Sequence, residues 1–195
     1  MNLPNTLTVA RIFLVPLLVV VLLTKFDYYW PFGFSKEILG AAIFGIASLT
    51  DWADGYLARR RKQVTGFGQW MDPLADKLLI TAALVSLVQL DLAQGWMVAV
   101  ILGREFAVTV LRSVAYAKGL TMPASPLGKI KLVAQVVAIE VLILGQGHLQ
   151  QFFVVGQIAL WVATIAALAS AVDYYRRFNS AMAKAANPGL SGPRP

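Results

Sequence analysis

The chain has 195 residues, of which 58% are hydrophobic and only 14% are charged. Soluble domains carry about 25% charged residues, so this composition argues against a water-soluble enzyme and excludes a disordered chain. There is no cysteine and a single histidine, which excludes disulfides, a thiolate nucleophile and metal sites built on either residue type. The net charge of +7 would suggest nucleic-acid binding in a soluble protein, but in a membrane protein it indicates basic cytoplasmic loops.

Six apolar segments follow one another along the chain, which predicts an all-α membrane protein: a bundle of six transmembrane helices of roughly 20 residues each. The expected spans are residues 7–23, 39–57, 73–90, 96–117, 127–144 and 152–174. The first could instead be a signal peptide, but no small-residue cleavage site follows it. The aromatic stretch at 25–34 that does follow is typical of a membrane interface. We expect one domain over residues 1–178, with no repeat, and a disordered tail over 179–195.

The basic residues predict the orientation of this bundle. With the N-terminus in the cytoplasm and six crossings, Lys25 and Lys36 face outward, and the other basic residues lie on or toward the cytoplasmic side. Loops rich in lysine and arginine stay in the cytoplasm. We therefore expect both termini in the cytoplasm, in a multi-pass protein of a bacterial inner membrane.

Four aspartates lie where the second and third spans approach the cytoplasm. Asp51 and Asp54 are three residues apart, and Asp72 and Asp76 are four apart, so each pair shares one helix face. Asp72 before Pro73 is typical of a helix start. The connection between the pairs is short and contains Gly66 and Gly68, so the two helices are expected to be antiparallel neighbours with facing pairs.

These aspartates have two interpretations. They could be helix caps and solvated interfacial residues, an interpretation that suits Asp72 alone better than all four. A charge at mid-membrane costs roughly 2.5–3.5 kcal/mol, facing carboxylates repel, and a divalent cation removes both penalties. Oxygen ligands favour Mg²⁺ or Mn²⁺ over zinc, and four carboxylates suffice for two ions that clamp an in-line phosphoryl displacement.

Residues 51–76, DWADGYLARRRKQVTGFGQWMDPLAD, resemble the signature of the CDP-alcohol phosphotransferase family. All eight fixed positions of that signature are present: Asp51, Asp54, Gly55, Ala58, Arg59, Gly68, Asp72 and Asp76. The opening NLPNTLTVARIFLVP, GREFAVTVLR at 103–112 and SPLGKIK at 125–131 are similar to the phosphatidylglycerophosphate synthases of the family. One departure is Leu132, where a threonine is common.

The resemblance implies a set of roles. Asp51, Asp54, Asp72 and Asp76 would hold two metal ions, and Asp76 would also take the proton from the acceptor hydroxyl. Residues that would bind the CDP part of the lipid donor are Gly55, Ala58, Arg59, Thr65 and Gly68. The hydroxyl of sn-glycerol 3-phosphate would attack the phosphorus attached to diacylglycerol and expel CMP. From the residues alone, Arg59 could hold a phosphate or anchor the helix at the membrane, as Arg60, Arg61 and Lys62 do. A homodimer is also suggested by the resemblance.

An acceptor that carries its own phosphate needs a second cationic site. Arg104 and Arg112 are eight residues apart on about one helix face, and Lys129 and Lys131 begin the next span. The lysines could instead be interfacial anchors. Ser125 could add a hydroxyl contact. Asn5 and Arg11 could reach the phosphate region or simply cap and anchor the first helix.

Several alternatives stay open. The same chemistry could use inositol phosphate, serine or phosphatidylglycerol as acceptor, and the basic residues do not separate inositol phosphate from glycerol 3-phosphate. A cation transporter is a candidate of another class, although carboxylates confined to one end of the bundle argue against an ion path. His148 falls in an outer loop, so direct displacement is simpler than a phosphohistidine, while an aspartyl intermediate stays possible. We expect Glu105 to pair with a basic residue across helices, and no role follows for Glu140.

Overall fold

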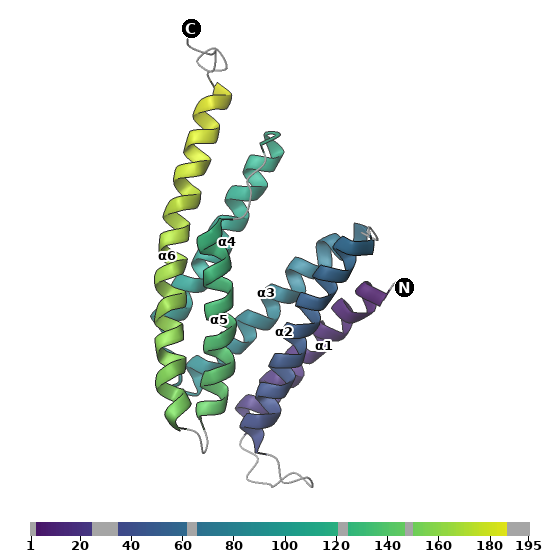
Figure 1. Ribbon diagram of the computed structural model, residues 1–195, viewed down its shortest axis with the longest axis vertical. Helices are drawn as coiled ribbons and strands as arrows, with labels where there is room; N and C mark the ends of the chain where they lie inside the picture. The colour runs from purple at the N-terminus through teal and green to yellow at the C-terminus, as the bar shows by residue number, and fades with distance from the viewer. Residues whose placement is uncertain (1–2, 25–34, 62–65, 121–124, 147–149, 187–195) are drawn as a thin grey trace.

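The computed structural model describes residues 3–24, 35–61, 66–120, 125–146 and 150–186. These residues form α-helices, in agreement with the predicted all-α class, and each predicted span has a helix (Figure 1). The six helices are α1 (Leu3–Leu23), α2 (Lys36–Arg61), α3 (Gly66–Gln89), α4 (Gly95–Ala117), α5 (Pro126–Gly145) and α6 (Gln150–Ala186). The aromatic stretch at 25–34 and His148 lie outside the described residues.

Two predicted helix boundaries are wrong. The third helix begins at Gly66 rather than at Asp72–Pro73, so Gly66 and Gly68 lie inside α3 and not in a connection. The sixth helix continues to Ala186, so residues 179–186 are helical rather than part of a disordered tail. This last segment is rich in alanine, the strongest helix former, and helices continue past their apolar stretch because each added turn satisfies backbone hydrogen bonds.

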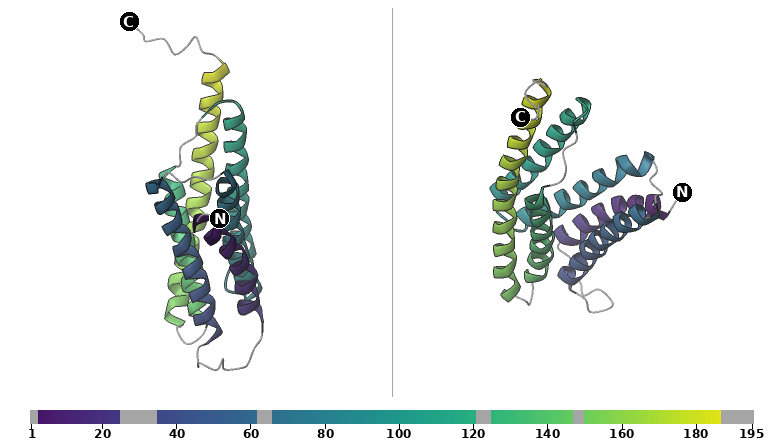
Figure 2. Two further views of the ribbon diagram at one scale, coloured as in Figure 1. Left: turned by 90° about the vertical axis from the view of Figure 1, so that its right-hand side faces the viewer. Right: turned by 45° about the horizontal axis from the view of Figure 1, so that its top comes forward.

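The helices pack as two groups that meet through α5 and α3. In one group α1 contacts both α2 and α3, and in the other α6 contacts α4 and α5. Contacts of α5 with α2 and α3, and of α3 with α4, join the groups. Figures 1 and 2 show that the upper ends of α4 and α6 diverge from the group formed by α1, α2 and α3. The two groups are therefore held together by one part of their length.

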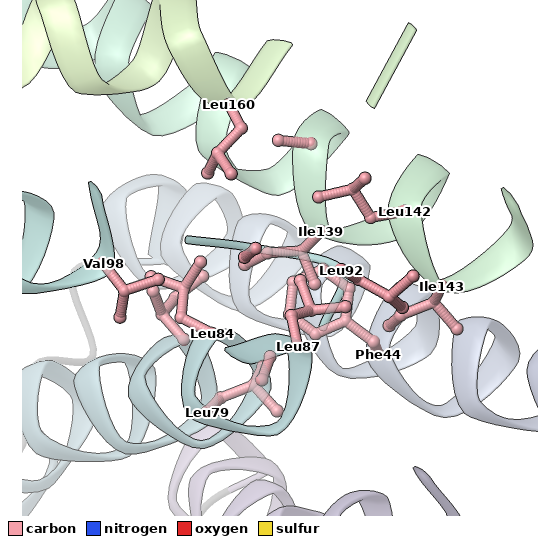
Figure 3. Packing of buried hydrophobic residues seen from close by; sticks show 14 of the residues in the cluster. Phe44, Leu79, Leu84, Leu87, Leu92, Val98, Ile139, Leu142, Ile143 and Leu160 are labelled. Atoms are coloured by element: carbon pink, nitrogen blue, oxygen red, sulfur yellow. The ribbon is translucent and has the colours of Figure 1, made fainter. Parts of the chain in front are cut away.

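The hydrophobic core lies at this junction. Buried side chains from α2, α3, α5 and α6, including Phe44, Leu87, Ile139 and Leu160, come together there (Figure 3). The core also takes Met97 and Ile101 from α4. Because dense packing makes a core resist deformation, this cluster fixes the angle between the two groups.

Glycines allow α5 and α6 to approach closely. A Cβ on Gly145 would lie 2.8 Å from the backbone nitrogen of Phe153, and one on Gly156 would lie 2.7 Å from the side chain of Leu142. Both distances are below normal contact, and the first involves backbone that cannot rotate away. The position of α6 against α5 therefore depends on these two residues lacking side chains.

By length and composition, one stretch among the described residues qualifies as a membrane span, namely Gln151–Ala183 in α6. Thr8–Leu23 in α1 is apolar but shorter. The helices α2 to α5 carry charged residues that lower their mean hydropathy. The six predicted helices are thus confirmed as helices, whereas the number of crossings does not follow from hydropathy alone.

Candidate active site

A pocket lies between α3, α4 and α5. It encloses about 390 Å³ of empty space, counting its open mouth. Its walls, called the α3–α5 pocket below, are formed by Asp76, Lys77, Ile80, Thr81, Leu102, Glu105, Phe106, Lys131, Leu132 and Gln135.

Asp76 lines this pocket and belongs to the aspartate motif, which consists of Asp51, Asp54, Asp72 and Asp76. It is half-buried on α3 and lies within electrostatic range of Lys131 on α5. The next residue, Lys77, donates from Nζ to the Thr109 hydroxyl at 2.6 Å, which ties α3 to α4 beside Asp76. The carboxylate predicted to accept a proton is thus held near a cationic wall.

An ion-pair network forms that wall. Lys131, 1% exposed on α5, donates from Nζ to Glu105 Oε1 on α4. The Nη1 atom of Arg104 lies 3.3 Å from the same carboxylate oxygen. The prediction that Glu105 pairs with a basic residue of another helix is therefore confirmed. A single carboxylate serves two cations here, which leaves positive charge for an anionic ligand.

A second group of residues, the arginine–tyrosine cluster, lies next to this network. It consists of Arg104, Arg112, Ser125, Ser170 and Tyr174. Arg104 donates from Nε to the Ser170 hydroxyl at 2.8 Å, and Arg112 donates from Nη2 to the Tyr174 hydroxyl. The backbone N–H of Ser125 donates to that same hydroxyl at 3.1 Å. Both guanidinium groups also face the Tyr174 ring, with 5.5 Å and 5.0 Å between Cζ and the ring centroid.

Gly128 gives Arg104 its space. A Cβ on Gly128 would lie 3.3 Å from Nη2 of Arg104. The guanidinium of α4 can therefore rest directly against the start of α5. This close approach brings α4, α5 and α6 together around two arginines.

The structure brings some predicted site residues together and not others. Arg104, Arg112, Ser125 and Lys131 gather through the network and cluster above, whereas Lys129 is exposed on α5. Arg11 is 1% exposed on α1, so it does not extend into the surroundings as a simple anchor. The side chains of the remaining predicted residues lie outside the described ones: Asn5, Asp51, Asp54, Gly55, Ala58, Arg59, Thr65, Gly68 and Asp72.

The donor set is compatible with a hard divalent cation. As predicted, α2 contains Asp51 and Asp54, and α3 contains Asp72 and Asp76. The two helices are in contact. Among the side chains that the structure describes, no three acidic or histidine residues gather, and Asp76 is the one member of the motif included there. Its carboxylate lines a pocket without sulfur or imidazole ligands, which suits Mg²⁺ or Mn²⁺.

Sequence reasoning missed three contributors: Tyr174, Ser170 and Gln135. Ser170 and Tyr174 are four residues apart, hence on one face of α6, near the end of its apolar stretch. Gln135 lies four residues after Lys131 on α5. Polar residues at one-turn spacing in apolar helices were the available signal, because such groups are rarely placed in a membrane without a partner.

Comparison with known proteins identifies the family of the chain. A family model described as CDP-alcohol phosphatidyltransferase matches residues 1–169, which include the aspartate motif and the α3–α5 pocket. The chain belongs to the CDP-alcohol phosphatidyltransferase family. Members of this family depend on a metal.

Curated relatives within the CDP-alcohol phosphatidyltransferase family share the name CDP-diacylglycerol–glycerol-3-phosphate 3-phosphatidyltransferase. The protein of Bacillus subtilis (strain 168) is 46% identical over 182 residues, covering 90% of this chain and 94% of the relative. That of Rickettsia felis is 36% identical over 177 residues, with coverages of 90% and 94%. That of Pseudomonas fluorescens is 36% identical over 182 residues, with coverages of 90% and 89%.

Proposed function

We propose that this chain is a membrane phosphatidyltransferase of phospholipid biosynthesis that transfers the phosphatidyl group of CDP-diacylglycerol to sn-glycerol 3-phosphate. The products are phosphatidylglycerophosphate, a precursor of phosphatidylglycerol, and CMP. One observation carries the proposal: Asp76 and a buried cationic network line one pocket, in a chain 46% identical to a relative named for this reaction.

The reaction is a direct displacement. The terminal hydroxyl oxygen of the acceptor forms a bond to the phosphorus attached to diacylglycerol, and the bond from that phosphorus to the CMP oxygen breaks. Asp76 takes the proton of the hydroxyl, and CMP leaves with the electron pair of the broken bond. Such a transfer needs alignment and charge neutralisation more than covalent catalysis.

The acceptor phosphate binds on the cationic side of the pocket. Lys131 provides buried charge from the pocket wall, and Arg104, Arg112, Lys129 and Ser125 are proposed to provide further contacts. A phosphate bound there is neutralised by groups already held by Glu105, Ser170 and Tyr174. A neutral acceptor would leave this positive charge uncompensated, so the observation favours a phosphorylated acceptor.

The lipid donor binds on the other side of the pocket. Gly55, Ala58, Arg59, Thr65 and Gly68 are proposed to bind its CDP part. Asp51, Asp54, Asp72 and Asp76 would hold two Mg²⁺ or Mn²⁺ ions, which when bound neutralise the diphosphate and the departing CMP.

The chain is proposed to cross a bacterial inner membrane six times, with both termini and the active site on the cytoplasmic side. Large apolar side chains are exposed on all six helices, for example Phe13, Leu49 and Ile165, which suits a lipid environment and not water. Among the described basic residues, Arg112, Arg176 and Arg177 lie in the C-terminal halves of α4 and α6, Lys118 directly follows α4, and Lys129 lies in the first turn of α5. That distribution supports a cytoplasmic position for these segments.

With this placement, the lipid donor is proposed to enter the active site sideways from the bilayer. Phe106 and Leu132 line the pocket and are 63% and 46% exposed, so its rim is partly apolar. The donor's acyl chains can then stay in hydrocarbon while its CDP group reaches the aspartates. Photo-crosslinking of lipid only to residues on the outer side would contradict this placement.

The test is CMP release by the full chain in detergent. CDP-diacylglycerol is supplied with glycerol 3-phosphate, inositol phosphate, serine or phosphatidylglycerol, each with Mg²⁺, with Mn²⁺ or with EDTA. We expect metal-dependent CMP release with glycerol 3-phosphate. In an Arg104→Ala variant, the KM should rise more for this acceptor than for the lipid donor. Absence of CMP release with every acceptor would exclude the enzyme, and cation flux in proteoliposomes would then favour a transporter.

A further inference from the structure

Gln135 is a buried amide for which the protein supplies no hydrogen-bond partner among the described residues. Its side chain is 1% exposed, it lines the α3–α5 pocket, and neither Oε1 nor Nε2 is hydrogen-bonded there. A buried polar group left without a partner lowers the stability of the folded state. Folded proteins contain few such groups, and those they retain call for an explanation such as a bound ligand.

The position of Gln135 relative to the cationic wall indicates which chemical groups such a ligand carries. Gln135 and Lys131 are four residues apart, so both face the pocket from one side of α5, separated by a rise of about 6 Å. Asp76 lines the same pocket from α3. A molecule that bridges these groups carries an anion at one end and neutral hydrogen-bonding groups a few bonds away.

An amide matches hydroxyl groups in a way that a charged residue would not. Its oxygen accepts one hydrogen bond while its NH₂ group donates, and a hydroxyl both donates and accepts. The amide carries no charge, so it neither repels the phosphate nor competes with Asp76 for a proton or cation. The α3–α5 pocket thus has separate places for the phosphate and for the carbon-bound hydroxyls of one acceptor.

We propose that Gln135 is a specificity-determining residue that binds the 2-hydroxyl of the acceptor, the hydroxyl that does not react. This inference rests on the proposed function, because it assigns one contact within that acceptor site. With the phosphate held by Lys131 and the 2-hydroxyl held by Gln135, a three-carbon acceptor has two fixed points, and its terminal hydroxyl is directed by both. Gln135 therefore distinguishes glycerol 3-phosphate from phosphorylated alcohols that lack a neighbouring hydroxyl.

The experiment compares two acceptors in the full-length enzyme: glycerol 3-phosphate and 3-hydroxypropyl phosphate, which lacks the 2-hydroxyl. The wild type should prefer glycerol 3-phosphate by at least about tenfold in kcat/KM, because a site built for a hydroxyl rejects the analogue without it. In Gln135→Leu the preference should fall to within about threefold, through lower activity toward glycerol 3-phosphate and unchanged activity toward the analogue. Gln135→Met, which keeps the unbranched shape, should give the same result.

Gln157→Leu is the matched control. Gln157 donates from Nε2 to the Leu92 carbonyl at 2.6 Å, away from the pocket, so its loss should leave the acceptor preference at the wild-type value. The melting temperature should not fall in Gln135→Leu, because the change removes an unpaired buried amide. The melting temperature therefore reports on folding, and the ratio of kcat/KM for the two acceptors reports on acceptor preference.

Three results would overturn the assignment. One is a wild-type preference retained in both Gln135 variants. Another is an equal loss of activity toward both acceptors in a folded variant. The analogue has no 2-hydroxyl, so removing the residue that binds this hydroxyl should not lower activity toward the analogue. If the wild type releases CMP with neither glycerol 3-phosphate nor its analogue, the proposed function itself fails and the inference fails with it.

Discussion

Tyr174→Phe removes one oxygen atom from the acceptor side of the site and keeps the ring. Tyr174 is 1% exposed on α6, and its hydroxyl accepts hydrogen bonds from Arg112 and from the backbone N–H of Ser125. The ring contacts with Arg104 and Arg112 persist in phenylalanine. The change therefore tests whether the hydroxyl holds Arg112 ready for phosphate.

The magnitude follows from the freedom that Arg112 regains. Arg112 is exposed apart from its contacts with Tyr174, so without the hydroxyl it is released into many rotamers. Ordering such a side chain on binding costs about 0.5–1.5 kcal/mol. We expect the KM for glycerol 3-phosphate to rise roughly 2- to 12-fold, since 1.4 kcal/mol corresponds to about tenfold. The KM for CDP-diacylglycerol and kcat should stay near wild type, because Arg112 is assigned to the acceptor site in the proposed function.

Initial rates of CMP release, with glycerol 3-phosphate varied at saturating lipid, measure this split. Tyr175→Phe is the matched control, because Tyr175 is the neighbouring residue, 58% exposed, and loses the same oxygen. An unchanged KM for glycerol 3-phosphate in Tyr174→Phe would refute the reasoning. So would an equal rise in Tyr175→Phe, or a fall in kcat alone.

Four further changes test other parts of the site and fold. Asp76→Asn should reduce turnover by about 10²–10⁴-fold while CMP still binds in a calorimetric titration, and loss of both would leave its role as base unsupported. Glu105→Gln should lower the melting temperature, because the buried cations Arg104 and Lys131 lose their carboxylate partner, and added glycerol 3-phosphate should restore part of the loss. A melting temperature that neither falls in the variant nor rises with glycerol 3-phosphate would contradict this. His148→Ala should keep nearly full activity, and an inactive variant would reopen a covalent mechanism. Gly145→Ala should destabilise the fold by about 1–3 kcal/mol, whereas Gly103→Ala, with nothing within 4 Å of its Cβ, should melt at or above the wild-type temperature.

The sequence predicted the helices better than their ends. Hydropathy located all six, and the fourth began and ended within one residue of α4, because its ends coincide with turn residues. It failed for α3 and α6, whose polar turns continue the helix beyond the apolar stretch. Apolar periodicity reports which surface avoids water, whereas helix length depends on backbone hydrogen bonding and on alanine content, as in residues 179–186.

Charged site residues were predictable and neutral ones were not. Arg104, Lys131 and Glu105 stand out in apolar helices because a charge there needs a partner, and the structure gives them one another. Tyr174 and Gln135 carry no charge, and each is an ordinary residue within its own helix. Their importance arises where helices distant in the chain pack together, which the one-turn spacing of polar residues signals but does not specify.

The two substrates of the proposed reaction differ in where they dissolve, and the fold divides their sites accordingly. The aspartate motif lies on α2 and α3 in one helix group, while the arginine–tyrosine cluster is built by α4, α5 and α6 in the other (Figure 1). The α3–α5 pocket lies where the groups meet, and the core beneath fixes their angle. Because the acceptor's hydroxyl must reach a donor held by the other group, core changes that alter this angle should lower kcat with little effect on either KM. Changes within one group should instead raise the KM for one substrate.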